Sequence, residues 1–102
     1  MKLTTSDRII LLIVLPKQAS MQEIGTSLEI IKLLDLSDEE KKAANFHDDG
    51  GRFGWDKDKD EEREIDLKHD HVSLLKKAIK ELDDAKQVQA VQYETFLKIN
   101  KL

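Results

Sequence analysis

The feature that most restricts how this chain can fold is an apolar run of seven residues, Ile9 to Leu15, with charge on both sides. Asp7 and Arg8 precede the run directly, and Pro16 ends it. A membrane span needs about 20 apolar residues, and a secretory signal needs a longer apolar region after a basic start. We therefore predict a fully buried element inside a globular domain, and we expect the protein in the cytoplasm.

Length and composition agree with one folded domain. The chain has 102 residues, within the range of about 100–150 that is usual for a domain with its own core, so residues 1–102 are treated as a single domain. It contains no Cys, which excludes disulfides and thiolate metal or redox chemistry. The formal net charge of −4 argues against a general polyanion binder.

Three groups of polar residues mark helix starts. Thr4 to Asp7 is a cluster of N-cap residues, which predicts a helix from about Ser6 to Leu15, although a buried strand is the alternative for a short run rich in Ile and Val. Capping-box spacing predicts the starts of two more helices, the second of them short and reaching Ala44. These boxes are Ser20 with Glu23 and Ser37 with Glu40.

A β-hairpin is predicted over residues 45–55. The turn is either Asp49-Gly50 or a four-residue loop from Asp48 to Gly51, and both choices put Phe46 opposite Phe53, on the same face as Trp55. Residues 64–68 alternate in period two and predict a short edge strand that returns to the hairpin.

The C-terminal third predicts helices. Asp70 can cap a helix that carries Val72, Leu75, Ile79 and Leu82 inward, and a last helix runs from about Ala90 to Asn100. One long helix over residues 72–100, bent near Lys86-Gln87, is the alternative, and we favour a break.

Together these elements predict one α+β domain of four or five helices packed with a small antiparallel hairpin or three-stranded sheet. The predicted core contains Ile10, Leu11, Ile13, Val14, Ile24, Leu28, Ile31, Phe46, Phe53, Trp55, Leu75, Ile79, Leu82, Tyr93, Phe96 and Leu97.

The charged stretch of residues 56–71 accounts for the whole excess of acid. Its start has the spacing of an EF-hand calcium loop, but Glu61 replaces the turn glycine and Leu67 replaces the bidentate Glu. We predict a solvated segment that steers a basic protein partner, with weak binding of a divalent cation at 56–64 left open. The candidate interaction surface is Asp56, Asp58, Asp60, Glu61, Glu62 and Glu64.

No residue pattern predicts catalysis, a cofactor or a defined metal site. His69 and His71 form a His-x-His pair, but nothing supplies the remaining zinc ligands, so we interpret them as surface residues beside a helix cap. Ser73 is not aimed at His71 by its spacing, and no glycine-rich phosphate loop precedes a helix. The sequence predicts that the protein is not an enzyme.

A nucleic-acid-binding role is the main alternative, because three helices followed by a hairpin is the element order of a winged helix. The predicted third helix begins Asp38-Glu39-Glu40, and the hairpin tip carries Asp48 and Asp49. Phosphate contacts supply most of the affinity for DNA, so both reading elements have the wrong sign.

The order of motifs along the whole chain resembles small uncharacterised proteins encoded by bacteriophages and prophages. The motifs are Thr-Thr-Ser-Asp-Arg before the apolar run, Leu36 to Glu40, an aromatic-Gly-Trp55 segment, Leu75 to Ile79 and Tyr93-x-x-Phe96-Leu97. The resemblance implies a bacterial cytoplasm and a non-catalytic part. We therefore predict protein–protein interaction, with a protein partner or, because the second helix is apolar over more than one face, a homodimer.

Overall fold

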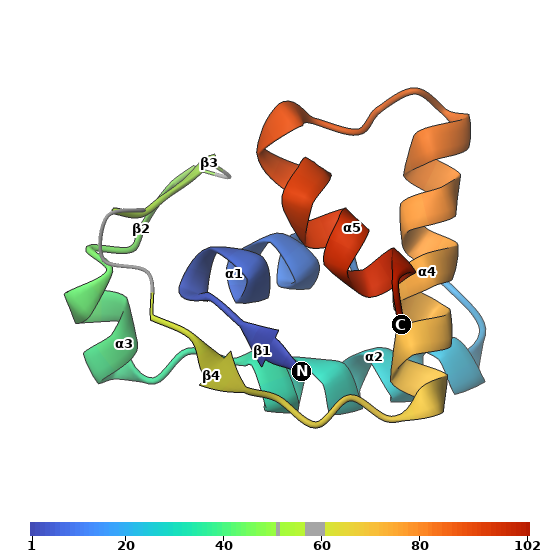
Figure 1. Ribbon diagram of the computed structural model, residues 1–102, viewed down its shortest axis with the longest axis horizontal. Coiled ribbons are helices and arrows are strands. Elements are labelled where there is room, and N and C mark those ends of the chain that lie inside the picture. The colour runs from blue at the N-terminus through green and yellow to red at the C-terminus, as the bar shows by residue number, and fades with distance from the viewer. Residues whose placement is uncertain (51, 57–60) are drawn as a thin grey trace.

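The fold is an assembly of helices with two very small antiparallel sheets (Figure 1). The computed structural model describes residues 1–50, 52–56 and 61–102. Within them the helices are α1 (Thr5–Val14), α2 (Met21–Leu34), α3 (Asp38–Ala43), α4 (His69–Asp84) and α5 (Tyr93–Asn100), and a 3₁₀ turn (Ala90–Gln92) leads into α5. The strands are β1 (Lys2–Leu3), β2 (His47–Asp49), β3 (Arg52–Gly54) and β4 (Arg63–Glu64). The predicted α+β class is confirmed.

The apolar run forms helix α1 at the centre of the fold and not a strand, but its predicted full burial is wrong at Ile13, which is 45% exposed. Helix α1 packs against α2, α4 and α5, and Figure 1 shows it between α2 below and α5 above. Its N-cap is Thr4, whose hydroxyl accepts the N–H of Asp7 at 3.1 Å while the Asp7 carboxylate accepts the N–H of Thr4 at 3.0 Å. Leu15 ends the helix with extended backbone because Pro16 follows it.

A two-stranded sheet of β1 and β4 closes the N-terminal side of the core. Lys2 lies opposite Glu64 and Leu3 opposite Arg63, and both Leu3 and the adjacent Ile65 are buried. The prediction that residues 64–68 form an edge strand beside the hairpin is therefore wrong. The strand in this segment, β4, ends at Glu64 and pairs with β1 at the start of the chain. No local sequence pattern specifies a pairing between residues about 60 positions apart.

The hairpin is present, but its register differs from the predicted one. Asp48 lies opposite Phe53 and Asp49 opposite Arg52, so the position across from Phe53 is held by Asp48 and not by Phe46. The connection falls one residue later than predicted, at 50–51. Gly50 has a φ of 62°, a left-handed conformation that glycine adopts without steric cost.

Most helix boundaries follow the predicted caps. The side chains of Ser20 and Ser37 accept the N–H groups of Glu23 and Glu40, each at 3.1 Å. A break also separates α4 from α5, which confirms the prediction of two helices over one long helix. Lys86 has a φ of 56° just after α4, which prevents the helix from continuing.

The start of α4 corrects a prediction, because Asp70 is not the cap. The helix begins at His69, and Nδ1 of His71 accepts the N–H of Lys68 at 3.1 Å. Asp70 lies in the first turn, where the helix dipole stabilises a negative charge.

The core joins residues from every long helix. Of the predicted core, Ile10, Leu11, Leu75, Ile79 and Phe96 are buried. A second group is only partly buried: Val14, Ile24, Phe46, Trp55 and Leu82. A third group is exposed, so its prediction was wrong: Ile13, Leu28, Ile31, Tyr93 and Leu97. The side chain of Phe53 lies outside the described part. The core contains instead Leu3, Ile9, Leu15, Ile30, Leu34, Leu36, Ala44, Ile65, Leu74, Ala78 and Ile99.

Among the residues that the structure describes, Arg8 is the largest fully buried side chain, with only 1% of its surface exposed. Its Nε donates to the Leu34 carbonyl at 3.1 Å, and its Nη2 donates to the Asp35 carbonyl at 2.5 Å. Its Nη1 pairs with the Glu40 carboxylate. Carbonyls at a helix C-terminus have no partner within the helix, so Arg8 caps α2 and ties it to the start of α3.

We expect Arg8→Ala to lower the free energy of unfolding by about 3–5 kcal/mol, because it removes one member of a buried ion pair and leaves two carbonyls without a donor. Arg63→Ala is the matched control. Arg63 donates to the same Glu40 carboxylate at 3.3 Å, but its side chain is 61% exposed, so its loss should cost less than about 1 kcal/mol. Urea unfolding measures both variants. Equal losses would contradict the role assigned to Arg8.

The same ion pair predicts how stability depends on pH. The guanidinium of Arg8 holds the pKa of Glu40 at about 2, against an ordinary value of 4.5; partial burial works in the opposite direction, and the Ser37 N–H assists Arg8. A carboxyl with a lowered pKa stabilises the fold above its ordinary value, and this contribution is lost as the pH falls towards 2. Urea midpoints measured between pH 7 and pH 2.5 should fall steeply below about pH 4.5.

Glu40→Gln should make that pH profile flatter and should lower stability at pH 7. The control is Asp38→Asn on the same helix, which removes a charge that contacts no described base. A Glu40→Gln profile as steep as that of the unaltered chain would show that Glu40 does not carry the effect.

Candidate functional site

The predicted acidic interaction surface is described only in part. Asp56, Glu61, Glu62 and Glu64 are exposed, and Asp58 and Asp60 lie outside the described residues. Glu64 belongs to β4 and accepts the Met1 ammonium at 2.9 Å, so it serves the small sheet. The EF-hand spacing also falls largely on residues 57–60, outside the described part. The interaction surface and the weak cation site therefore stay predictions.

The histidine pair does not form a shared site. His69 is exposed, but His71 is buried, which corrects its assignment to the surface. Both ring nitrogens of His71 face protein groups: Nδ1 accepts the Lys68 N–H, and Nε2 lies 3.4 Å from a carboxylate oxygen of Glu29 on α2. Among the described residues, no group of three or more His, Asp or Glu is placed to hold a metal ion.

A cleft of about 420 Å³ lies between the start of α1 and α5, and Asp7 lines it. Thr95 Oγ1 donates to Asp7 Oδ1 at 2.5 Å, and Lys98 Nζ donates to Oδ2 at 2.6 Å. The Thr4 N–H also donates to Oδ2. With three donors on one carboxylate, Asp7 anchors α5 to α1 and has little capacity left for a ligand.

The protonation state of Asp7 agrees with this structural role. Burial raises the pKa of the Asp7 carboxyl, but the hydrogen bonds from Lys98, Thr95 and the Thr4 backbone outweigh burial, and the pKa lies below its ordinary value of 3.8. A general acid or base needs a pKa near the working pH, and Asp7 is shifted away from it.

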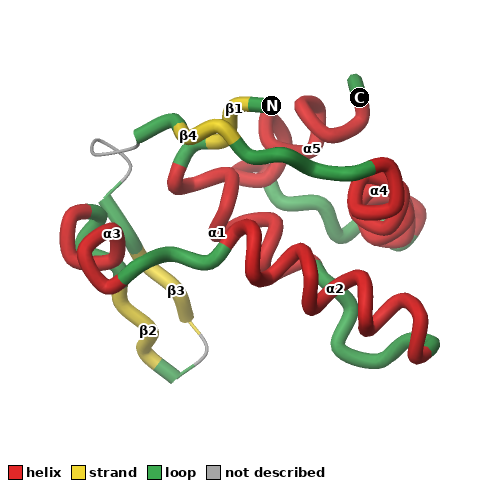
Figure 2. Tube along the Cα trace, turned by 90° about the horizontal axis from the view of Figure 1, so that it is seen from below, coloured by secondary structure: helices red, strands yellow, loops and turns green. Residues whose placement is uncertain are grey.

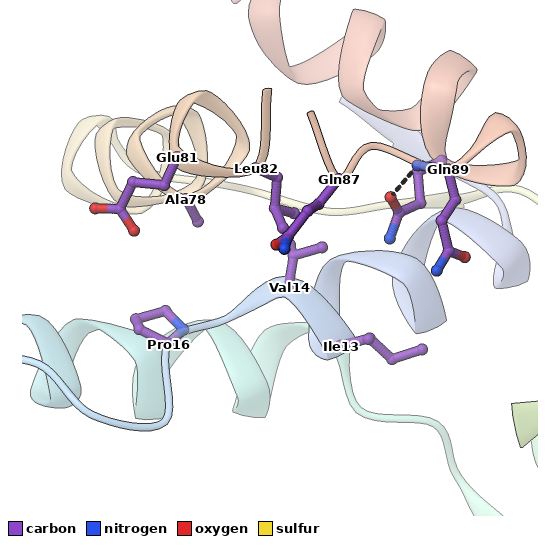
Figure 3. A pocket seen from close by; sticks show the side chains of 9 residues that line it. Ile13, Val14, Pro16, Ala78, Glu81, Leu82, Gln87 and Gln89 are labelled. Atoms are coloured by element: carbon purple, nitrogen blue, oxygen red, sulfur yellow. Dashed lines mark hydrogen bonds between the residues drawn. The ribbon is translucent and has the colours of Figure 1, made fainter. Parts of the chain in front are cut away.

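A second hollow, of about 720 Å³, lies between the end of α1 and the C-terminal half of α4 (Figure 3). In Figure 3, Val14 and Leu82 point toward one another across it, and Ile13 points away from them. Of the described residues that line it, Glu81 alone is ionisable, and the remaining polar side chains are the amides of Gln87, Gln89 and Gln92. The hollow offers apolar contact and amide hydrogen bonds, but no pair of groups for acid–base or nucleophilic chemistry.

The most unusual surface is the outward face of α2. Its apolar side chains Met21, Ile24, Leu28 and Ile31, here called the outer stripe, are spaced three, four and three residues apart. Met21 is 95% exposed, Leu28 55% and Ile31 39%. The helix faces the core with Ile30 and Leu34, which are fully buried. α2 therefore carries two apolar faces, and only one of them is used by the fold.

The position of α2 leaves the outer stripe accessible. α2 runs along the lower side of the molecule in Figure 1, and Figure 2, seen from below, shows no other described helix across its near side. A Cβ added at Gly25, within the same stretch of helix, would meet no atom within 4 Å. The space beside Gly25 is therefore open, whereas Glu23, on another side of the same stretch, pairs with Lys77 of α4 at 2.7 Å.

Two charges lie at the C-terminal end of α2, Lys32 in its last turn and Asp35 at its C-cap, and Lys17 precedes the helix by four residues. All three are exposed, and none forms an ion pair with another described residue. Asp35 lies at the negative end of the α2 dipole, an unfavourable position for an acid.

Comparisons with known proteins add no relative. No protein-family model matches the chain, and no curated protein or solved structure matches it. The resemblance to phage and prophage proteins therefore stays a prediction. Within the described residues, no helix combines the length and apolar character needed to cross a membrane.

Three residues of the outer stripe belong to the predicted core, of which Leu28 and Ile31 are exposed and Ile24 is partly buried. Ile24, Leu28 and Ile31 were predicted to face the core, because their spacing is as regular as that of the buried positions. The width of the apolar surface on α2 could have indicated an exposed apolar face, since a helix packed on one side needs only a single apolar stripe.

Paired alanine substitutions test which face of α2 is buried. Ile30→Ala should lower the free energy of unfolding by about 2–5 kcal/mol, because it leaves a cavity in the core. Leu28→Ala, on the opposite face of the same helix, should cost less than about 1 kcal/mol. Denaturant unfolding of both variants measures the difference. A larger loss for Leu28→Ala would mean that the outer stripe packs inward.

Proposed function

We propose that this protein acts without catalysis, by binding another protein through the outer stripe of α2. The observation that carries the proposal is the exposure of Met21, Leu28 and Ile31 on one face of a helix whose other face already serves the core. Single exposed apolar residues are normal on protein surfaces, but a contiguous apolar stripe is typical of an interaction site.

The spacing of the outer stripe supports helix-mediated recognition. Partner proteins that bind a helix use anchors separated by three, four and seven residues, and Met21, Ile24 and Leu28 have this spacing. Met21 adds a flexible, polarisable side chain at the most exposed position, and such residues adapt well to a partner surface.

Support for a role without catalysis comes from the described clefts. The cleft at Asp7 contains a carboxylate occupied by three donors, and the hollow beside Val14 contains one carboxylate and three amides. The Asp7 cleft is also lined by Tyr93, Glu94 and Lys98, but the pKa of Asp7 is lowered and so moved away from the working pH of a general acid or base. The described lining of the hollow holds no pair of titratable groups.

The nucleic-acid alternative has less support. α3, the helix that would enter the major groove, has six residues and carries Asp38, Glu39 and Glu40 in its first turn. A reading helix with three acids repels phosphate. The absence of Cys agrees with a reducing compartment, so we propose the cytoplasm, and a phage or prophage origin remains part of this proposal.

Site-specific photo-crosslinking tests the proposal. A photoreactive amino acid placed at Leu28 in bacterial cells that produce the protein should yield covalent protein adducts on irradiation, because this side chain lies at the centre of the outer stripe. Matched positions are Glu39, exposed on α3, and Glu62, exposed in the acidic segment. Adduct yield at position 28 should exceed the yield at either control at least tenfold.

The two control positions also allow the other possible crosslinking results to be interpreted. Adducts at Glu62 but not at Leu28 would move the interaction to the acidic segment and overturn the assignment to α2. Equal, low yields at all three positions would contradict protein binding by either surface.

A further inference from the structure

We propose that the partner of the outer stripe is a second copy of this chain, with the two α2 helices antiparallel. This inference rests on the proposed function and adds the identity and orientation of the partner. An interface with twofold symmetry requires a surface that complements itself, and the outer stripe and its flanking charges meet that requirement.

The apolar positions match in an antiparallel pair. Met21, Ile24, Leu28 and Ile31 occupy the a and d positions of a heptad pattern, which form the seam between paired helices. When the helices run in opposite directions, Met21 lies beside Ile31 of the second copy and Ile24 beside Leu28. Gly25 lies next to the twofold axis, where its missing side chain allows the two helices to approach closely.

The charges decide the orientation. Asp35 continues the spacing of the outer stripe and has no described ion-pair partner. In an antiparallel pair, the Asp35 carboxylate lies at the N-terminus of the second α2, near Lys17, so both the helix dipole and the opposite charge favour it. In a parallel pair, Asp35, which occupies an a position, would face Asp35 of the second copy. Like charges therefore disfavour the parallel arrangement.

The exposed area predicts the strength of the pairing. A standard stable interface buries about 800 Å² on each partner, and one stripe of four side chains supplies less than that. The pairing should therefore be reversible and depend on protein concentration. In sedimentation measurements the mean mass should rise from 11.7 kDa towards twice that value as concentration increases, and Leu28→Lys should weaken the association at least tenfold.

Disulfide trapping tests both pairing and orientation, because the chain contains no Cys of its own. Two single variants are made, Met21→Cys and Ile31→Cys. Under mild oxidation, a mixture of the two should form a disulfide-linked dimer with one chain of each kind, at least tenfold faster than either variant alone. Glu39→Cys, exposed on α3, serves as the control for random collision.

Charge reversal supplies a second, independent test of the register. Asp35→Lys should weaken the association about two- to fivefold, as expected for an exposed charge pair, and Lys17→Asp in the same chain should restore it. Both substitutions are at exposed positions, so the fold should remain intact. Failure of the double variant to recover would contradict the antiparallel register.

The results separate this inference from the proposed function. Equal disulfide formation by each cysteine variant alone would overturn the antiparallel arrangement. A chain that stays monomeric at every concentration, while position 28 still crosslinks to other proteins, would overturn self-pairing and leave the proposed function standing. A monomeric chain with no adducts at position 28 would contradict both.

Discussion

The packing of this protein depends on two adjacent charged residues that are buried at the start of the central helix. The Arg8 guanidinium binds the carbonyls at the end of α2 and the Glu40 carboxylate, and the neighbouring Asp7 carboxylate binds Thr95 and Lys98 on α5. Burying a charge is costly unless hydrogen bonds compensate for it, so these partners have to be in place when the core forms. α1 thus contributes apolar area along its length and directional polar contacts at its first turn.

This arrangement also decides which side of α2 faces outward. Because Arg8 donates to the Leu34 and Asp35 carbonyls, the end of α2 is held against α1, with Ile30 and Leu34 directed inward. The outer stripe is then directed away from the core. The surface that we propose as the interaction site is therefore a consequence of how Arg8 holds the end of α2, and the two faces of that helix serve different purposes.

Local signals predicted the elements well and their tertiary partners poorly. The boxes at Ser20 and Ser37 act within four residues, so the sequence contains everything that determines those helix starts. The strand near Glu64 was found, but its partner β1 is about 60 residues away, and many pairings of two short strands satisfy the same pattern. Asp7 and Arg8 were interpreted as the polar boundary of an apolar run, because nothing in the sequence shows that their partners lie on α2, α3 and α5.

Local patterns suffice to predict the α+β class, the starts of α1, α2 and α3, and the burial of Ile9, Ile10, Leu11 and Leu15 in the apolar run, because caps and apolar periodicity act over short distances. Long-range contacts determine which stripe of α2 is buried, where β4 pairs and what the charges of Asp7 and Arg8 contact. The outer stripe has four apolar side chains and the buried face of α2 has Ile30 and Leu34, so hydrophobicity alone does not select the buried face. In the observed arrangement the polar groups at helix ends have partners: Arg8 donates to the Leu34 and Asp35 carbonyls, and Asp7 accepts from Thr95 and Lys98.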